Sequence, residues 1–387
     1  MALVARAFVA ADFAVDLELL VEVHAVRTRS DAKGTQGARR RRGTARLRRV
    51  DVFKKLCDLV AIPSVTGDER DYADALSREL VGLGLDVERQ ELAPGRFNVL
   101  ARGARPRVVF CTHLDTVPPF FGPREDRDAV HGRGSCDAKG PALAMIEAAR
   151  TLLAQGEDRI GFLFTCGEET DSAGAALANA KLAEPWRPAF TIVGEPTENR
   201  FAGAHKGIYK AELRASGVAG HSSQSIGPSA IHELVHVLEK LLAQEWGTHP
   251  LLGPGTLNVG MIEGGVASNV VADRASASLL LRAVEPVDVT ERKLCSCLSP
   301  HVRIDKAYKS YGPVEFVVPT GHEPIPVAFG TDAPHLGRWG KPLLYGPGRI
   351  LDAHTDHELV SKRSFERAVH DYATTARELL SRAEACA

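Results

Sequence analysis

Residues 161–169 read Gly-Phe-Leu-Phe-Thr-Cys-Gly-Glu-Glu, an apolar run that ends in a glycine and two adjacent acids. A continuous apolar run of this length is typical of a strand that is buried inside a parallel sheet. In open α/β sheets, ligands bind beyond the carboxyl ends of such strands. Because neighbouring side chains point in different directions there, one of Glu168 and Glu169 could hold a cation while the other acts as a base.

The composition is that of an ordinary globular protein. Of the 387 residues, 44% are hydrophobic and 25% are charged, and this length is enough for two domains. No apolar run approaches the length of a transmembrane helix, so we expect no membrane partner. The seven cysteines are odd in number and irregularly spaced, which predicts free thiols in a reducing, cytoplasmic compartment.

Residues 25–49 form a basic segment with nine arginines, one lysine and one aspartate, in a chain whose net charge is −1. Such a block could bind nucleic acid or belong to a targeting peptide. Four acids among residues 1–24 argue against a transit peptide. Blocks of like charge are usually solvated, so we expect residues 1–49 to be a disordered extension, or sequence upstream of the true start, and we do not favour nucleic acid as a partner.

Helix and strand patterns alternate from residue 50 to about residue 206. The expected helices cover residues 52–60, 68–83, 141–154 and 173–183. The expected strands lie near Val87 and at residues 98–100, 108–111, 161–166 and 189–194. This alternation predicts an α/β domain built around a largely parallel sheet.

The pattern changes near Lys206. Strand patterns at residues 208–216, 256–263 and 276–283 surround an amphipathic helix at residues 229–244, which predicts a helix packed on an antiparallel sheet. The α/β pattern returns after about Tyr311. We therefore predict a catalytic domain made of residues 50–206 and 312–387, with a smaller α+β domain, residues 207–311, inserted into it.

Candidate metal ligands stand at the ends of predicted strands or before a predicted helix. They are His113, Asp137, Glu195 and His354, together with one of Glu168 and Glu169. Two imidazoles and three carboxylates are too many for one tetrahedral zinc but suit two metals that share a carboxylate. Metals roughly 3.5–4 Å apart lower the pKa of a shared water and polarise a carbonyl, so the set predicts hydrolysis. Asp115, two residues after His113, is interpreted as the carboxylate that orients that imidazole.

Several motifs together carry a family resemblance. Residues 113–118 (His-Leu-Asp-Thr-Val-Pro), 132–140 (Gly-Arg-Gly to Asp-Ala-Lys-Gly), 167–169 (Gly-Glu-Glu) and 194–197 (Gly-Glu-Pro-Thr) resemble the dinuclear zinc aminoacylase and carboxypeptidase family. Residues 204–207, 220–223 and 331–334 and the segment from Gly346 to His354 resemble its acetylornithine deacetylase branch. The resemblance runs from about Val50 to the C-terminus. It implies a phosphorylase/hydrolase-like catalytic sheet with an inserted lid and dimerisation domain.

Carried over position by position, the resemblance implies two zinc ions bridged by Asp137. The other ligands would be His113 and Glu195 for one metal, and Glu169 and His354 for the second. Glu168 would be the general base, and the peptide bond between Asp137 and Ala138 would be cis. Histidine and carboxylate ligands also accept cobalt or manganese.

Residues of the inserted domain complete the expected site. A lone histidine is usually structural, but the resemblance implies that His221 stabilises the oxyanion, often from the partner subunit, which predicts a homodimer through the inserted domain. A guanidinium can hold a carboxylate with two hydrogen bonds, and the resemblance assigns Arg282 and Asn269 to the α-carboxylate of the substrate. Gly330 and Thr331, which belong to the predicted catalytic domain, would add backbone contacts to the same carboxylate. An acid that often stands two residues before this arginine is replaced by Leu280.

Residues 232–236 read His-Glu-Leu-Val-His, which is the pattern of many zinc proteases. On a helical projection, the two histidines fall roughly 110–150° from the centre of the apolar side. The side chains expected on that buried side are Ile231, Leu234, Val235, Leu238 and Leu242. We therefore expect the two histidines to face water or a flank of the helix rather than a metal.

These observations predict a cytoplasmic metallohydrolase that removes an acyl group from an N-acyl amino acid. An acetylornithine deacetylase-like activity, as in arginine biosynthesis, is the first expectation. Desuccinylation of succinyl-diaminopimelate, as in lysine biosynthesis, and cleavage of a dipeptide or a carboxyl-terminal residue are alternatives of the same class. A non-catalytic scaffold that binds nucleic acid through its arginine-rich extension is the alternative from another class. A scaffold has no need to keep ligands, and this chain keeps a full set.

Overall fold

The structure is a computed structural model that describes residues 51–308 and 310–385. The expectation for the arginine-rich extension, residues 1–49, falls outside the described residues.

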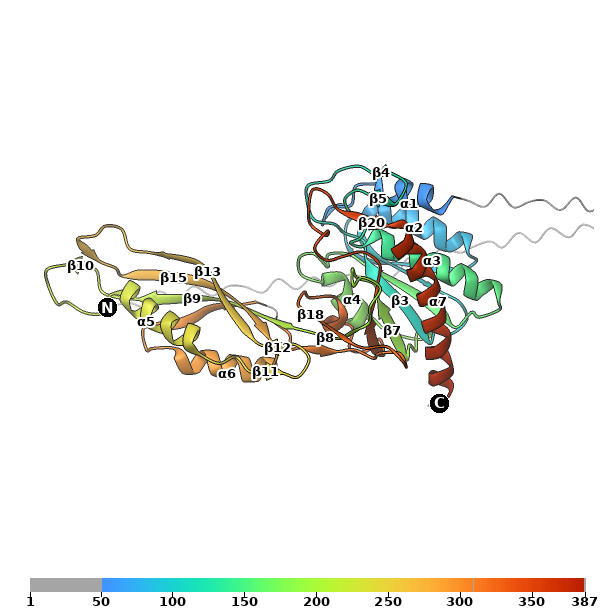
Figure 1. Cartoon of the computed structure of the whole chain (residues 1–387). Coiled ribbons are helices and arrows are strands. Elements are labelled where there is room, and N and C mark those ends of the chain that lie inside the picture. The colour runs from blue at the N-terminus through green and yellow to red at the C-terminus, as the bar shows by residue number, and fades with distance from the viewer. Residues whose placement is uncertain (1–50, 309, 386–387) are drawn as a thin grey trace, which may run out of the picture. The chain divides into compact units, whose positions relative to one another are not determined.

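A six-stranded sheet forms the centre of the α/β part (Figure 1), with the strand order β1-β2-β6-β3-β7-β19. Strands β6, β3, β7 and β19 are parallel to one another, whereas β1 and β2 at one edge are antiparallel to their neighbours. The strands are β1 (Asp86–Ala93), β2 (Arg96–Arg102), β3 (Val108–His113), β6 (Ile160–Thr165), β7 (Phe190–Val193) and β19 (Lys341–Leu344). The prediction of a mainly parallel sheet is confirmed.

Helices cover both faces of this sheet. Since side chains alternate along a strand, Phe162 and Phe164 of β6 enter the larger hydrophobic cluster and Leu163 between them enters another. The larger cluster includes residues of α1 (Val52–Val60), α2 (Arg70–Gly82), α3 (Lys139–Ala154) and α7 (Lys362–Ala385). The opposite face is covered by α4 (Ala173–Ala180) and by Trp186 and Trp339. Burial on both faces explains why the strand sequences are continuously apolar.

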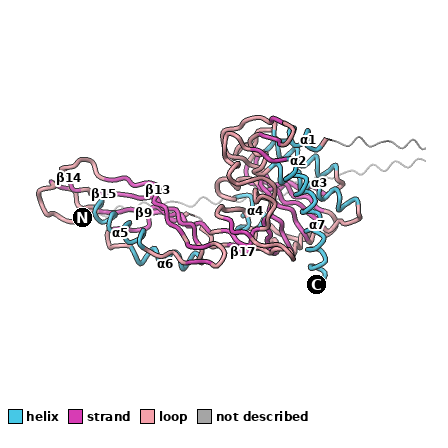
Figure 2. The backbone as a smooth tube through the Cα atoms, in the orientation of Figure 1, coloured by secondary structure: helices cyan, strands magenta, loops and turns pink. Residues whose placement is uncertain are grey.

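A four-stranded antiparallel sheet is built from residues 207–307, with the order β13-β15-β9-β16. It has its own hydrophobic cluster, to which two helices contribute, and Figure 2 shows these helices beside the strands. The elements are β9 (Gly207–Ser216), α5 (Ala230–Ala243), β13 (Thr256–Gly264), β15 (Arg274–Ala283), α6 (Val287–Cys297) and β16 (Val302–Ala307). The expected arrangement of a helix packed on an antiparallel sheet is therefore present. Helix α6 and strand β16 were not predicted from the sequence.

Helix α5 buries a different face from the one expected. Among the five apolar residues assigned to the buried side, Leu234 and Leu238 are buried, but Ile231, Val235 and Leu242 are exposed. Ala230, Val237 and Leu241 are buried with the first two. On a 100° projection, the buried arc is therefore rotated by roughly 70° from the expected one. The expectation that His232 and His236 do not face the core is confirmed, because both are exposed.

Short strands shape the loops around the two larger sheets. One three-stranded sheet consists of β20 (Leu359–Ser361), β5 (Ala129–His131) and β4 (Arg124–Glu125), and another of β17 (Val314–Glu315), β8 (Ala202–His205) and β18 (Ile325–Val327). Two-stranded pairs are formed by β10 (Gly220–His221) with β14 (Val270–Val271), and by β11 (Thr248–His249) with β12 (Gly253–Pro254). The short helix η1 covers Ala333–His335.

Two expectations from composition can be compared with the described part of the chain. No helix among residues 51–308 and 310–385 combines the length and the apolar character needed to cross a bilayer. The six cysteines in these ranges are free thiols, as the irregular spacing predicted.

Candidate metal centre

The predicted ligands come together at one edge of the central sheet. His113 is the last residue of β3, Glu168 and Glu169 follow β6, and Glu195 follows β7. Because these strands are parallel, their carboxyl ends meet at the same edge. Asp137 is supplied by the loop before α3, so the ligands come from segments far apart in sequence.

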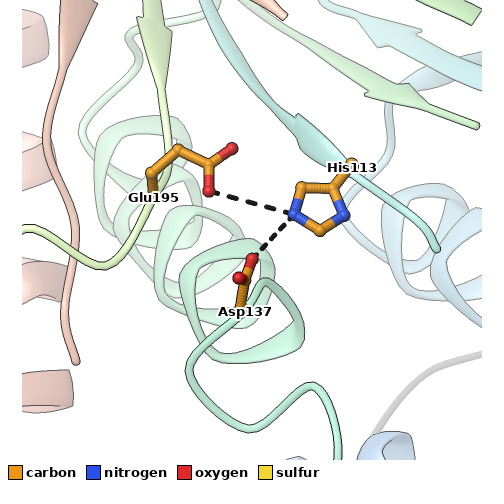
Figure 3. A group of neighbouring side chains, drawn as sticks. All are labelled: His113, Asp137 and Glu195. Atoms are coloured by element: carbon orange, nitrogen blue, oxygen red, sulfur yellow. Dashed lines mark hydrogen bonds and ion pairs between the residues drawn. The ribbon is translucent and has the colours of Figure 1, made fainter. Parts of the chain in front are cut away.

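One group of possible ligands consists of His113, Asp137 and Glu195, which are all buried. The Nε2 atom of His113 lies 2.9 Å from Oδ1 of Asp137 and 3.9 Å from Oε2 of Glu195. Figure 3 shows both carboxylates directed at this nitrogen. The three ligand atoms lie within 4.8 Å of one another, which is the arrangement that three ligands of one cation require.

A second group consists of Asp137, Glu169 and His354. The Nε2 atom of His354, in the loop after β19, lies 3.1 Å from Oε1 of Glu169 and 3.3 Å from Oδ2 of Asp137. Asp137 therefore presents one oxygen to each histidine and belongs to both groups. This is the geometry of a carboxylate shared between two adjacent cation positions.

Buried charge is concentrated at this edge. Burial, followed by the charge of Glu195, raises the pKa of Glu168 well above its usual value. Burial likewise raises the pKa of Glu195 well above its usual value, and the charge of Asp137 adds to the rise. Neighbouring buried carboxylates disfavour each other's negative charge. Bound cations would compensate this charge, so the arrangement is suited to binding metal ions.

The two histidines experience the opposite effect. Burial favours the neutral form of His113, but hydrogen bonds to Asp115 and Asp137 outweigh it and raise the pKa of this imidazole well above its usual value. Hydrogen bonds to Asp137 and Glu169 raise the pKa of His354 to about 10. The carboxylates thus favour positive charge at the Nε2 atoms of His113 and His354. A divalent cation bound between an imidazole and its neighbouring carboxylates would supply such charge.

Asp115 is buried, but its hydrogen bonds differ from the expected ones. The Nδ1 atom of His113 lies 2.8 Å from the backbone carbonyl oxygen of Asp115, whereas the carboxylate is 3.7 Å away. The carboxylate instead accepts hydrogen bonds from the backbone amides of Gly167, Glu168 and Glu169, at 3.0, 3.0 and 3.2 Å. Three amides converge on this carboxylate because the chain turns sharply after β6. Asp115 thereby orients the imidazole through its backbone and the two glutamates through its side chain.

The loop before α3 contains a cis peptide bond between Asp137 and Ala138. This agrees with the geometry that the family resemblance implied for the residue after the bridging aspartate.

Sequence reasoning did not assign a role to Asp332, which lies between Thr331 and η1. Its carboxylate is buried and accepts a hydrogen bond of 2.5 Å from Oγ1 of Thr165, the last residue of β6. Burial raises the pKa of Asp332 to about 6, and the charge of Asp332 contributes to the raised pKa of Glu168. The signal that could have identified it is an acid directly after two residues expected to bind substrate, Gly330 and Thr331.

The remaining predicted site residues belong to neither group of possible metal ligands. His221 is exposed on β10, and its Nδ1 atom lies 2.8 Å from Oγ of Ser223. The backbone carbonyl of Asn269, which is also exposed, accepts a hydrogen bond from the amide of Ser222. His221 and Asn269 therefore lie next to each other, where β10 pairs with β14.

Arg282 lies near the other end of β15 from that pair. Strand β15 begins at Arg274, a few residues after Asn269. Since a strand rises about 3.3 Å per residue, the eight residues from Arg274 to Arg282 span roughly 26 Å. The structure therefore does not bring Asn269 and Arg282 of one chain together.

Gly330 and Thr331 immediately precede Asp332 in the chain. Thr331 is buried, and its Oγ1 atom accepts a hydrogen bond from the amide of Ala333. A β-carbon at Gly330 would lie 2.2 Å from the hydroxyl oxygen of Tyr311, so this position is closely packed. Burial raises the pKa of the Tyr311 hydroxyl, the charge of Glu168 adds to the rise, and the charge of Arg282 opposes it.

Known proteins share both the sequence and the fold. A model of the peptidase family M20/M25/M40 matches residues 109–378. A peptidase M20 domain-containing protein of Schizosaccharomyces pombe is 36% identical over 328 residues, which cover 81% of each chain. A probable carboxypeptidase of Aspergillus flavus is 34% identical over 362 residues, which cover 81% of this chain and 87% of the other.

Two solved structures share the architecture at lower identity. Aminopeptidase PepT from Bacillus cereus superposes with a TM-score of 0.71 at 18% identity, covering 85% of this chain and 98% of that one. An M20 family metallo-carboxypeptidase from Sulfolobus solfataricus gives a TM-score of 0.65 at 17% identity, covering 85% and 99%. The site and these matches together define a hydrolase fold that carries two groups of possible metal ligands. The chain belongs to the peptidase family M20/M25/M40.

Proposed function

We propose that this protein is a dinuclear metal-dependent hydrolase that cleaves an amide bond whose nitrogen belongs to an amino acid with a free α-carboxylate. This class includes N-acyl amino acids and the carboxyl-terminal residue of a peptide. The observation that carries the proposal is the position of Asp137, with one carboxylate oxygen facing each group of ligands.

Zinc is the first choice for both positions, and cobalt or manganese are alternatives, because all three accept imidazole and carboxylate ligands. When bound, two such cations lower the pKa of water and polarise a carbonyl group. A solved Bacillus subtilis protein of the same family, with a TM-score of 0.64 at 14% identity, is described as a dinuclear metal-binding peptidase, which supports the proposed number of cations.

Glu168 is proposed as the general base. It adjoins the ligand Glu169 but belongs to neither ligand group, so its carboxylate stays available for proton transfer. Its raised pKa makes it a stronger proton acceptor than an exposed glutamate. In this proposal Glu168 takes a proton from the attacking water and returns it to the nitrogen of the leaving amino acid.

The substrate carboxylate is proposed to bind Arg282, with the backbone of Gly330 and Thr331 beside it. A guanidinium offers two parallel donors to a carboxylate. Tyr311 packs against Gly330, and the charges of Arg282 and Glu168 both act on the pKa of its hydroxyl, which supports a substrate position near this tyrosine.

His221 and Asn269 are proposed to act across a homodimer. They lie at the end of β15 remote from Arg282, so within one chain they are not positioned for the same substrate. An apolar stripe along α5, made of Ile231, Val235 and Leu242, is exposed in the single chain. Exposed apolar patches on a folded domain mark interaction surfaces, which supports a dimer formed by this part of the chain.

The acyl group remains the open choice within this substrate class. An acetylornithine deacetylase-like activity is supported by the motifs at residues 204–207, 220–223 and 331–334. A carboxypeptidase activity is supported by the description of the Aspergillus flavus relative. Desuccinylation of succinyl-diaminopimelate and dipeptide cleavage are further reactions of this class. Whichever of these reactions it catalyses, we propose that the protein is cytoplasmic.

A substrate panel tests the proposal directly. Purified protein would be freed of metal with a chelator, reloaded with zinc, cobalt or manganese, and assayed with acetylornithine, succinyl-diaminopimelate, a dipeptide and a peptide with a blocked amino terminus. We expect metal-dependent release of a free amino acid from at least one of them, and its loss when the α-carboxylate is amidated. Release that is independent of metal, or no release from any of them, would contradict the proposal.

A further inference from the structure

Glu358 is a buried acid that belongs to neither ligand group. Its residue is 0% exposed. One carboxylate oxygen, Oε1, accepts hydrogen bonds of 3.1 Å from the backbone amides of Cys136 and Asp137. The other oxygen, Oε2, lies 2.7 Å from Nη1 of Arg133. Both oxygens of this side chain are therefore committed to the segment that supplies the shared ligand.

Arg133 is buried to the same degree, with 1% exposure. Its Nε atom donates a hydrogen bond of 3.3 Å to the carbonyl oxygen of Pro119, and its guanidinium lies over the ring of Phe121 at 5.2 Å from the centroid. The guanidinium is thus fixed by three contacts. A buried pair of this kind has lost its solvation by water, so breaking it by removing one charge is strongly destabilising.

The position of Glu358 in the chain gives the contact its significance. Glu358 comes four residues after the ligand His354 and immediately before β20. Its backbone carbonyl accepts a hydrogen bond of 3.0 Å from the amide of Gly132, and Leu359 pairs with His131 of β5. The loop that carries His354 is therefore attached to the loop that carries Asp137 by both its backbone and one carboxylate.

The second ligand group depends on this attachment more than the first. Asp137 and His354 come from the two connected loops and meet at 3.3 Å. In contrast, His113 ends β3 and Glu195 comes two residues after β7, and the hydrogen bonds between these adjacent strands already fix the spacing of the two ligands. A displacement between the two loops would separate the ligands of the second group and leave His113 and Glu195 in place.

We propose that Glu358, held by Arg133, is a positioning residue that sets the distance between Asp137 and His354 and so creates the second metal position. This inference rests on the proposed dinuclear function. Glu358 touches neither the metals nor the substrate and acts only through Asp137 and the loop of His354. Hydrogen-bonding partners of this kind change metal affinity by about 10- to 100-fold when they are removed.

Metal titration tests the inference without relying on activity. Metal-free wild-type protein and Glu358→Gln would be titrated with Co²⁺, followed by visible absorption and calorimetry. We expect wild type to bind two equivalents, and the variant to bind one of them about 10- to 100-fold more weakly, with a much smaller change for the other equivalent, which also uses Asp137. The variant should also show a lower kcat with a similar KM, because the substrate-binding residues are untouched.

Two further variants separate positioning from general stability. Glu285→Gln removes the partner of Lys293 (2.5 Å apart) next to the four-stranded sheet, and we expect it to lower the melting temperature without changing either cobalt affinity. Arg133→Lys keeps the buried positive charge but not the planar geometry, so we expect it to fold and to weaken the same single equivalent. If Glu358→Gln does not fold, Arg133→Lys decides the question.

The inference is overturned if folded Glu358→Gln, or in its place Arg133→Lys, binds both equivalents with wild-type affinity. It is also overturned if both equivalents weaken equally, since that would show general loosening of the site. A wild-type protein that binds fewer than two equivalents would instead refute the dinuclear proposal itself, and the two failures are distinguished by the wild-type titration alone.

Discussion

Two neighbouring glutamates illustrate how position decides the role of a residue. Glu169 lies 3.1 Å from His354 and shares a ligand group with it, whereas Glu168 has its pKa raised by burial and by nearby carboxylates. Asp115 holds the backbone amides of both. The same carboxylate therefore fixes the relative position of a proposed base and a proposed ligand.

Exchanging each glutamate for its amide separates these roles. We expect Glu168→Gln to retain two metal equivalents and to lose about 10²- to 10⁴-fold in kcat, because a carboxamide cannot accept the proton. Glu169→Gln should weaken one metal equivalent. Metal analysis after dialysis and steady-state kinetics are the measurements, with Glu198→Gln, an exposed glutamate, as the control. The reverse pattern would exchange the two assignments.

His205 gives a pH-dependent contribution to stability. It is buried, its Nδ1 atom lies 2.9 Å from the carbonyl of Lys206, and burial lowers its pKa from 6.5 to about 4. The unfolded chain therefore binds the proton at a higher pH than the folded protein does. The resulting stability is present above pH 6.5 and is lost as the pH falls towards about 4, by roughly 3 kcal/mol in total.

Replacing this histidine should remove that part of the acid sensitivity. We expect the unfolding free energy of His205→Phe, measured with urea at several pH values between 7 and 4, to fall less steeply than that of wild type. Phenylalanine retains ring packing against Phe316. His236→Gln, at an exposed position on α5, is the control and should follow the wild-type curve. Parallel curves for wild type and His205→Phe would contradict the expectation.

The sequence predicts the ligands well at this scale, because each is a distinctive residue at the end of a recognisable apolar strand. It does not predict the partners of Asp115 or Glu358. Asp115 is 52 residues away in sequence from Gly167, whose amide it binds. Glu358 is 222 residues away from Cys136, whose amide it binds. Their hydrogen bonds depend on how loops fold back, and no local pattern records this.

At the scale of elements, the central strands are predicted closely and the face of α5 is not. Strand β6 is a continuous apolar run that follows charged residues and precedes a glycine and two acids, a pattern that marks where the strand begins and ends. Helix α5 packs on β9 and β15 and also contacts α6, a helix that was not expected from the sequence. The buried arc includes Val237 and Leu241, and the stripe of Ile231, Val235 and Leu242 is exposed.

This exposed stripe provides a test of the dimer at the level of the helix. We expect the double variant Val235→Glu/Leu242→Glu to shift the protein from dimer to monomer, because burying two carboxylates in an apolar interface is costly. Both side chains are more than half exposed, at 53% and 63%, so the fold should persist. Analytical ultracentrifugation and circular dichroism are the measurements, and Glu239→Gln on the same helix is the control.

The dimer variant also reports on His221. If His221 completes the site of the partner subunit, the monomeric variant should lose activity and mixing it with an inactive Glu168→Gln protein should not restore it. A variant that is monomeric yet fully active would show that His221 is not needed from a partner. A variant that remains dimeric would show that the stripe is not the interface.

On the scale of the whole molecule, the fold class follows from the alternation of helix and strand patterns. Membership of the peptidase family M20/M25/M40 follows from motifs distributed over the chain. The substrate does not follow in the same way. Its acyl group would contact loops such as the one around Tyr311, whose positions depend on several elements at once, and such loops have no periodic pattern that a sequence can reveal.

Metal removal should affect stability as well as activity. A ligand that binds only the folded state stabilises it by about 2.7 kcal/mol at a concentration of 100 times Kd. We therefore expect chelation to lower the melting temperature and added zinc to raise it again, as measured by calorimetry. His113→Ala should remove most of this response, while His236→Gln, at the exposed position on α5, should keep it. Equal melting temperatures with and without metal would contradict a metal site in the folded core.

The shared carboxylate of Asp137 has a thermodynamic consequence for the metal pair. In the proposed dinuclear site, a cation at either position would change the charge of the carboxylate that the other position uses, so the two binding equilibria would be linked. Linkage is reciprocal: whatever factor the first ion imposes on the affinity of the second, the second imposes on the first. The loading of this protein would then be a property of the pair, and no single dissociation constant would describe either position alone.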